Sequence, residues 1–98
     1  MSSIIIDAFL FDDENEDEFA THGISAIQVE QLLENESVIL PNRRKDKHKA
    51  THLLIGRDNG GGPKTVPIEP THEAGVWRPV TAWVAKTWDL AELENRGI

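Results

Sequence analysis

Arginine and histidine side chains that could act on a phosphodiester are spread along this chain. Arg57 ends one expected strand, Arg78 opens another, and His22 and His52 are groups that can move protons. Guanidinium groups bind phosphate through two hydrogen bonds and stabilise charge that develops on a scissile phosphate. The 2′-hydroxyl of RNA supplies its own nucleophile, so a metal-free ribonuclease needs only positioning, positive charge and a proton acceptor. The residue types therefore suggest RNA cleavage as one candidate chemistry.

A compact cationic run, RRKDKHK at residues 43–49, is the second feature, in a chain whose formal net charge is -7. Residues 1–42 contain ten Asp or Glu and no Lys or Arg, so the charge is divided along the chain. If the two halves form different faces, nucleic acid is attracted to one face only. The alternative is that the acidic residues simply solvate the outer faces of two helices. The residues of the run that could hold an RNA backbone are Arg43, Arg44, Lys45, Lys47 and Lys49.

Three tryptophans fall within residues 77–88, although the chain has only six aromatic Phe, Trp and Tyr residues. In a regular strand over VWRPVTAWVA, side chains alternate, so Trp77, Thr81 and Trp83 are expected on one face. A half-open face carrying Trp77 and Trp83 near the cationic run could stack unpaired bases, which typically contributes about 1 to 3 kcal/mol per base. Trp88, on the expected closing helix, is predicted to pack in the core.

Other catalytic and metal-binding motifs are not supported. A phosphate loop cannot be placed on GGGPKT, because a start at Gly56 puts Gly62 at the lysine position, and a glycine-rich hairpin turn explains the segment instead. His48 and His52 lack the glutamate of a zinc helix and lead into a strand, where they would be about 13 Å apart. The absence of cysteine removes thiol chemistry. We expect neither a metal nor a cofactor.

The elements that must position these residues begin with an apolar strand, SSIIIDAFLF. A short helix then follows from Asp12 or Asp13 to a terminating Gly23. The best-specified helix starts at Ser25, which opens an S-x-x-Q capping box, and should run to about residue 35. The apolar opening stops at Phe11, too short for a membrane span or a secretory segment, so a soluble, untargeted, cytoplasmic protein is expected.

The second half of the chain changes to period-two patterns. SVILP, THLLIGR, KTVPIEP and VWRPVTAWVA read as successive strands, and KTWDLAELENRG reads as a closing helix. The expected order is β-α-α-β-β-β-β-α. We therefore predict a single α+β domain over residues 1–98, with helices packed on one face of an antiparallel sheet of four to five strands.

Three stretches, FLFDDENEDEFATHGIS, LLIGR and WRPVTAWVA, resemble in order and spacing the BrnT family of bacterial toxins over roughly residues 9–95. The resemblance implies a RelE-like ribonuclease toxin of a type II toxin-antitoxin pair. It also implies a ribbon-helix-helix antitoxin that neutralises the toxin and binds operator DNA, so that DNA contact is indirect. The positions that match the family pattern are Asn15, His22, Gly23, Ser25, Gly56, Arg57, Arg78, Thr81, Ala82 and Ala85.

The combined candidates divide into two sets. The catalytic candidates are Arg57, Arg78, His22, His52 and Thr81. Trp83 and the five cations of the run are the RNA-binding candidates. This chain departs from the family where it has Trp83, Val84 and the acidic DLAELEN in place of basic residues. Two functions therefore remain open: a metal-independent endoribonuclease, and a non-catalytic protein- or nucleic-acid-binding module that keeps the toxin fold.

Overall fold

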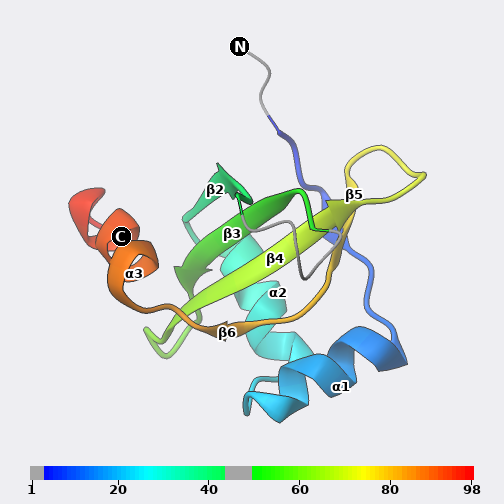
Figure 1. Cartoon of the computed structure of the whole chain (residues 1–98), viewed down its shortest axis with the longest axis horizontal. Helices are drawn as coiled ribbons and strands as arrows, with labels where there is room; N and C mark the ends of the chain where they lie inside the picture. The colour runs from blue at the N-terminus through cyan, green and yellow to red at the C-terminus, as the bar shows by residue number, and fades with distance from the viewer. Residues whose placement is uncertain (1–3, 44–49) are drawn as a thin grey trace.

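The computed structural model describes residues 4–43 and 50–98, which form an α+β fold as the sequence predicts (Figure 1). Radius of gyration is 12.4 Å for the Cα atoms, as expected of a domain of this length. The elements in chain order are β1 (Ala8–Phe9), α1 (Asp13–Thr21), α2 (Ala26–Glu34), β2 (Ser37–Pro41), β3 (His52–Arg57), β4 (Pro63–Pro70), β5 (Val76–Pro79), β6 (Trp83–Val84) and α3 (Thr87–Asn95).

The sheet is mixed, with the strand order β1-β5-β4-β3-β2, and β6 pairs with β4 beyond the end of β5. β2, β3, β4 and β5 form the antiparallel meander that the sequence predicts. β1 runs parallel to β5, and only Ala8 and Phe9 of the apolar opening pair with it. The expectation of a wholly antiparallel sheet is wrong at this edge, because α1 and α2 carry the chain away from β1 before β2 begins.

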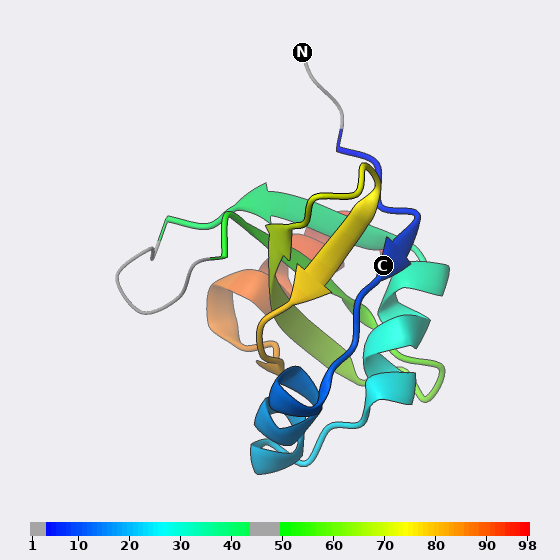
Figure 2. The same ribbon diagram turned by 90° about the vertical axis from the view of Figure 1, so that its right-hand side faces the viewer.

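The helices lie on both sides of the sheet (Figure 2). On one side, which we call the α2 face, the helix residues Phe19, Val29 and Leu32 form a core with Leu54 and Val66 of the strands. The opposite side, which we call the α3 face, carries a smaller cluster of Val38, Ile55, Ala85 and Leu93. The prediction that the helices share one face therefore holds for α1 and α2 but not for α3.

Both helix starts follow the local sequence. Asp12 caps α1 in a capping box with Asn15, and Ser25 caps α2 in the predicted box with Gln28. Asn15 is fully buried, and its Nδ2 donates to the main-chain oxygen of Leu10 at 3.0 Å. The asparagine of the family-like motif therefore joins α1 to the end of β1.

One extra residue interrupts the strand that was expected over residues 76–85. Ile68 of β4 pairs with Pro79, whereas Thr65, three residues earlier, pairs with Trp83, four residues later. A single inserted residue reverses the side-chain alternation of everything that follows it. Trp77 consequently packs on the α2 face, whereas Trp83 lies on the α3 face with Thr65. The prediction that the two tryptophans share a face is wrong.

The prediction that Trp88 is a core residue is also wrong, because its side chain is 78% exposed. Leu93, fully buried against β2 and β3, fixes the inner side of α3. Trp88 precedes it by five residues, which places it about 140° away around the helix. Its backbone neighbour Thr87 has a φ of 47°, an uncommon value for a β-branched residue.

A close approach between α2 and the sheet explains the glycine of the LLIGR segment. A Cβ atom on Gly56 would lie 3.2 Å from the Cβ of Ser37 and 3.7 Å from the Cβ of Leu32. Any side chain there would push α2 and β2 away from β3. The position is therefore explained by packing rather than by chemistry.

Candidate functional site

The Arg78 guanidinium is the centre of a cluster with three carboxylates, which we call the Arg78 cluster. Its Nε lies 2.8 Å from Oδ2 of Asp12. Its Nη1 lies 3.1 Å from Oε2 of Glu69, the residue of β4 that pairs with Arg78. Its Nη2 lies 3.2 Å from Oδ1 of Asp12 and 2.9 Å from Oε1 of Glu14. The Arg78 hydrogen bonds, with help from the backbone N–H of Asn15, lower the pKa of Asp12. Hydrogen bonds to Asp12 and, to a smaller extent, to Glu69 raise the pKa of Arg78 above its ordinary value, against the opposing effect of burial.

The members of the cluster differ in exposure. The side chains of Arg78 and Glu69 are 18% and 23% exposed, whereas that of Glu14 is 83% exposed. An exposed side chain is held weakly in an ion pair, so Glu14 can leave at little cost. Three carboxylates around one guanidinium give the cluster a net negative charge. When Glu14 moves away, Asp12 and Glu69 still leave the cluster with a net charge of -1, so positive charge from elsewhere is needed to hold a phosphate here.

Arg57 occupies the other end of the sheet. Its Nε donates to the main-chain oxygen of Ile98 at 3.1 Å, and its Nη1 donates to that of Gly61 at 3.0 Å. Arg57 pairs with Pro63 of β4, whereas Arg78 pairs with Glu69 six positions further on. Six residues of strand span about 20 Å. The two arginines therefore share the α3 face, but the structure does not bring them to a single phosphate.

The two candidate histidines lie elsewhere. His52 pairs with Ile68 and lies on the α2 face, where its ring contacts that of Trp77 edge-on at 5.4 Å. Its Nδ1 also shares a 2.8 Å hydrogen bond with Oγ1 of Thr51. His22 is exposed at the C-terminal cap of α1. Within the described ranges, no hydrogen bond or ion pair joins either histidine to Arg78.

Trp83 lies on the α3 face between the two arginines and nearer to Arg57, whereas the described residues that flank the cationic run lie at the Arg78 end. Trp83 is partly buried and faces Thr65, between the strand positions of Arg57 and Arg78. Arg43 is exposed, just after β2 ends. β2 ends and β3 begins beside Ile68 of β4, which is next to the partner of Arg78. The chain therefore leaves the sheet and returns to it at the Arg78 end. The other cations of the run, Arg44, Lys45, Lys47 and Lys49, lie outside the described residues.

Thr81 is buried, with 4% exposure, and its hydroxyl has no hydrogen-bond partner among the described residues. A buried hydroxyl without a partner costs about 1 to 3 kcal/mol. We therefore expect Thr81→Val to raise the free energy of unfolding by about 1 kcal/mol, measured by urea denaturation. Thr65→Val is the matched control and should lower it, because Thr65 Oγ1 donates to Oδ2 of Asp89 at 2.8 Å. A loss of stability in both variants would show that the Thr81 hydroxyl has a partner in solution.

A buried ion pair at the β3–β4 turn was not predicted from the sequence. Lys64 Nζ lies 2.8 Å from Oδ2 of Asp58, and both side chains are 8% exposed. Asp58 Oδ1 also accepts hydrogen bonds from the backbone N–H groups of Gly60 and Gly62, each at 2.9 Å. Its pKa is lowered chiefly by the Lys64 hydrogen bond, which outweighs the effect of burial. The available signal was the aspartate that opens DNGGGP, since aspartate often bonds to the backbone of its own turn.

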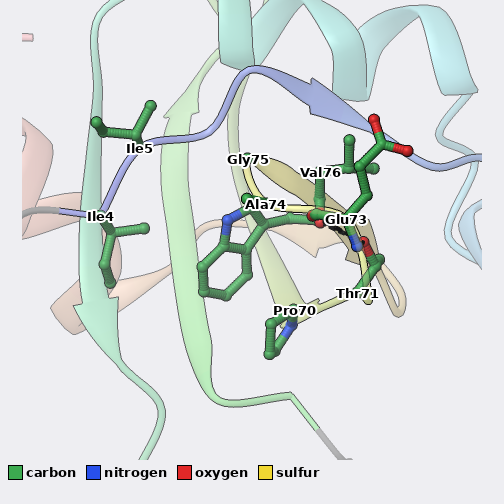
Figure 3. Close-up of a pocket in the computed structure, with 9 residues that line it drawn as sticks. Ile4, Ile5, Pro70, Thr71, Glu73, Ala74, Gly75 and Val76 are labelled. Carbon is green, nitrogen blue, oxygen red and sulfur yellow. Dashed lines mark hydrogen bonds between the residues drawn. The ribbon is translucent and has the colours of Figure 1, made fainter.

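Two shallow hollows flank β1. One, of about 330 Å³, lies between Ile4 and Ile5 and the β4–β5 hairpin with Glu73 (Figure 3). The other, of about 420 Å³, lies beside α2 and is lined by Phe9, Phe11, Ala26, Ile27 and Glu30. None of the candidate catalytic residues lines either hollow. In residues 4–43 and 50–98, no group of His, Asp or Glu side chains is arranged to hold a metal ion.

No protein-family model, curated protein or solved structure matches the chain. No helix in the described part of the chain is long and apolar enough to cross a membrane. The class that the structure defines is a small α+β domain with helices on both faces of a mixed sheet. The resemblance to BrnT toxins stays a prediction from the motif residues.

Proposed function

We propose that this protein is a cytoplasmic RNA-binding module with a RelE-like, BrnT-type fold, and that it holds single-stranded RNA along its α3 face. The observation that supports this most directly is the order of Arg57, Trp83 and Arg78 along that face. β4 pairs with them at Pro63, Thr65 and Glu69, so they span about 20 Å. Two guanidinium groups this far apart, with an aromatic ring between them, suit two phosphates several nucleotides apart on one extended strand and a stacked base between them.

Charge supports the same face. The chain enters and leaves the cationic run at the Arg78 end of the sheet, and the run carries half of the Lys and Arg residues of the protein. Asp12 and Glu14 at the start of α1 contact Arg78 at this same end, so their carboxylates oppose part of the attraction that the run provides. Glu14 is the most exposed carboxylate of the cluster and the one that must leave Arg78 before a phosphate oxygen can bind Nη2 beside Asp12.

A second candidate is RNA cleavage, which would make the protein a metal-independent ribonuclease toxin neutralised by a ribbon-helix-helix antitoxin. The observation that favours it is the anchoring of Arg78. Asp12 and Glu69 fix its Nε and Nη1, while its Nη2 faces the displaceable Glu14. Such a guanidinium is oriented in advance for a scissile phosphate. Arg57 would then bind the RNA backbone about 20 Å from Arg78, and it would not contact the scissile phosphate.

Binding is tested with a fluorescein-labelled single-stranded RNA in EDTA, followed by fluorescence anisotropy. Trp83→Ala and Arg78→Ala should each weaken binding about tenfold or more, because a stacked base or a phosphate contact is lost. Trp88→Ala is the matched control, since Trp88 is 78% exposed on the outer side of α3 and should leave the affinity unchanged. Glu14→Gln should tighten binding. Equal affinity in wild-type protein, Trp83→Ala and Arg78→Ala would refute the α3 face as the RNA site.

The same samples, run on a denaturing gel, distinguish binding from cleavage. RNA cut by the wild-type protein in EDTA and left intact by Arg78→Ala would establish the ribonuclease. RNA that stays bound and intact, with and without added ribosomes, would leave the binding module as the function.

A further inference from the structure

We propose that the hollow beside α2 is a docking site for a basic amphipathic helix of a partner protein. This site is separate from the α3 face, because it lies between β1 and α2 on the opposite side of the sheet. Its walls are Phe9 and Phe11 on one side and Ala26 and Ile27 on the other. β1 and the chain that joins it to α1 run beside α2 in Figure 2.

The apolar residues that line this hollow are partly open to solvent. Ile27 is 70% exposed, Phe11 and Ala26 are half-buried, and Phe9 is buried. Exposed apolar side chains that gather around a depression are typical of protein interaction sites, whereas single ones are ordinary. Here the exposed Ile27 and the half-buried Phe11 and Ala26 line one hollow together. The feature therefore calls for an apolar ligand.

Charge selects the ligand class. The hollow is built only from residues 9–30, within the part of the chain that has ten Asp or Glu and no Lys or Arg. Glu30 lines it, Glu34 follows one helical turn later on the same side of α2, and Asp13 follows the Phe11 wall. A partner with Lys or Arg around an apolar stripe complements this border. A second copy of the chain would bring carboxylates against carboxylates.

The shape favours a helix over an extended strand. Ala26 and Glu30 are one turn apart on α2 with Ile27 beside them, so the wall is a helical ridge with a small residue in it. Helices pack against such ridges, and an amphipathic helix in a groove is a common mode of recognition. The expected ligand thus carries leucine-like side chains at helical spacing and basic residues on the flanking positions.

Three synthetic helical peptides of about 15 residues test the proposal, each with the same leucine stripe and with Lys, Gln or Glu at the other positions. Fluorescence anisotropy at physiological salt should give the tightest binding for the Lys peptide and at least about tenfold weaker binding for the Glu peptide. Ile27→Ser should weaken the Lys peptide about tenfold. Val84→Ser, which changes a 46% exposed valine elsewhere, is the matched control and should not weaken it.

Any other result of the peptide experiment would contradict the proposal, and each such result has its own meaning. An Ile27→Ser variant that binds the Lys peptide as well as wild type would mean general attraction to an acidic protein. Equal affinities of the Lys and Glu peptides would refute the charge argument. A concentration-dependent dimer that Ile27→Ser abolishes would show that a second copy occupies the hollow. RNA affinity is measured on the same variant and should be unchanged, so failure here and failure of the α3 face are separable.

Discussion

Replacing Asp58 by alanine is expected to lower the free energy of unfolding by about 3 kcal/mol, the low end of the range for breaking a buried ion pair. The substitution leaves the ammonium of Lys64, whose side chain is 8% exposed, without its carboxylate. It also removes the acceptor for the backbone N–H groups of Gly60 and Gly62 and for Nε2 of Gln28, 3.3 Å away. The β3–β4 turn and its tie to α2 therefore weaken together.

Urea denaturation of wild type and variant at neutral pH measures this loss. The control is Glu92→Ala, which breaks the exposed pair between Glu92 and Arg96 on α3 and should cost at most about 0.5 kcal/mol. Asp58→Asn should fall between them, because the amide oxygen can still accept from the turn. Similar losses for Asp58→Ala and Glu92→Ala would mean that the Lys64 ammonium reaches water easily.

Local sequence patterns predicted the elements well. The N-caps at Asp12 and Ser25 and the turn at Gly23 depend on residues within four positions of one another, so they could be identified along the chain. The strands from Ser37 to Pro70 also follow their alternation and turn signals. These interactions are short in sequence, and the competing long-range contacts do not override them.

The arrangement in space was harder to predict. The side of the sheet that α3 covers depends on packing of Leu93 against Val38 and Ile55, which no local pattern specifies. The inserted residue before Trp83 is visible only as a change of register against β4. The second error moved Trp83 to the other face, because strand side chains alternate.

The residues of the candidate site were also hard to predict, because their contacts are long-range in sequence. The family-like residues Asn15, Gly23, Ser25 and Gly56 all have structural explanations, as a buried cap, a left-handed turn, an N-cap and a close approach. Their presence therefore indicates the fold more than an activity. The three carboxylates around Arg78 include two that are more than 60 residues away in sequence, at separations of 66 and 64. Charge counting along the chain could not predict that they meet.

Asp12→Ala is expected to lower the free energy of unfolding by about 2 kcal/mol, because Asp12 has two structural roles. Its Oδ1 accepts from the backbone N–H of Asn15 at 2.8 Å, and loss of such an N-cap costs about 1 kcal/mol. Both of its oxygens also accept from Arg78, whose side chain is only 18% exposed, and a partly exposed pair of this kind contributes up to about 1 kcal/mol. Urea denaturation at pH 7 measures the sum.

Asp12→Asn separates the two roles, since asparagine is as good an N-cap as aspartate but carries no charge. At pH 7 it should lose only the Arg78 contribution, about 1 kcal/mol. Because folding lowers the pKa of Asp12 from 3.8, the carboxylate stabilises the fold above that value, and its contribution is lost as the pH falls through the folded pKa. The stability difference between wild type and Asp12→Asn should therefore shrink as the pH is lowered below about 4. A difference that stays constant down to the acid transition would show that Arg78 does not hold Asp12 in solution.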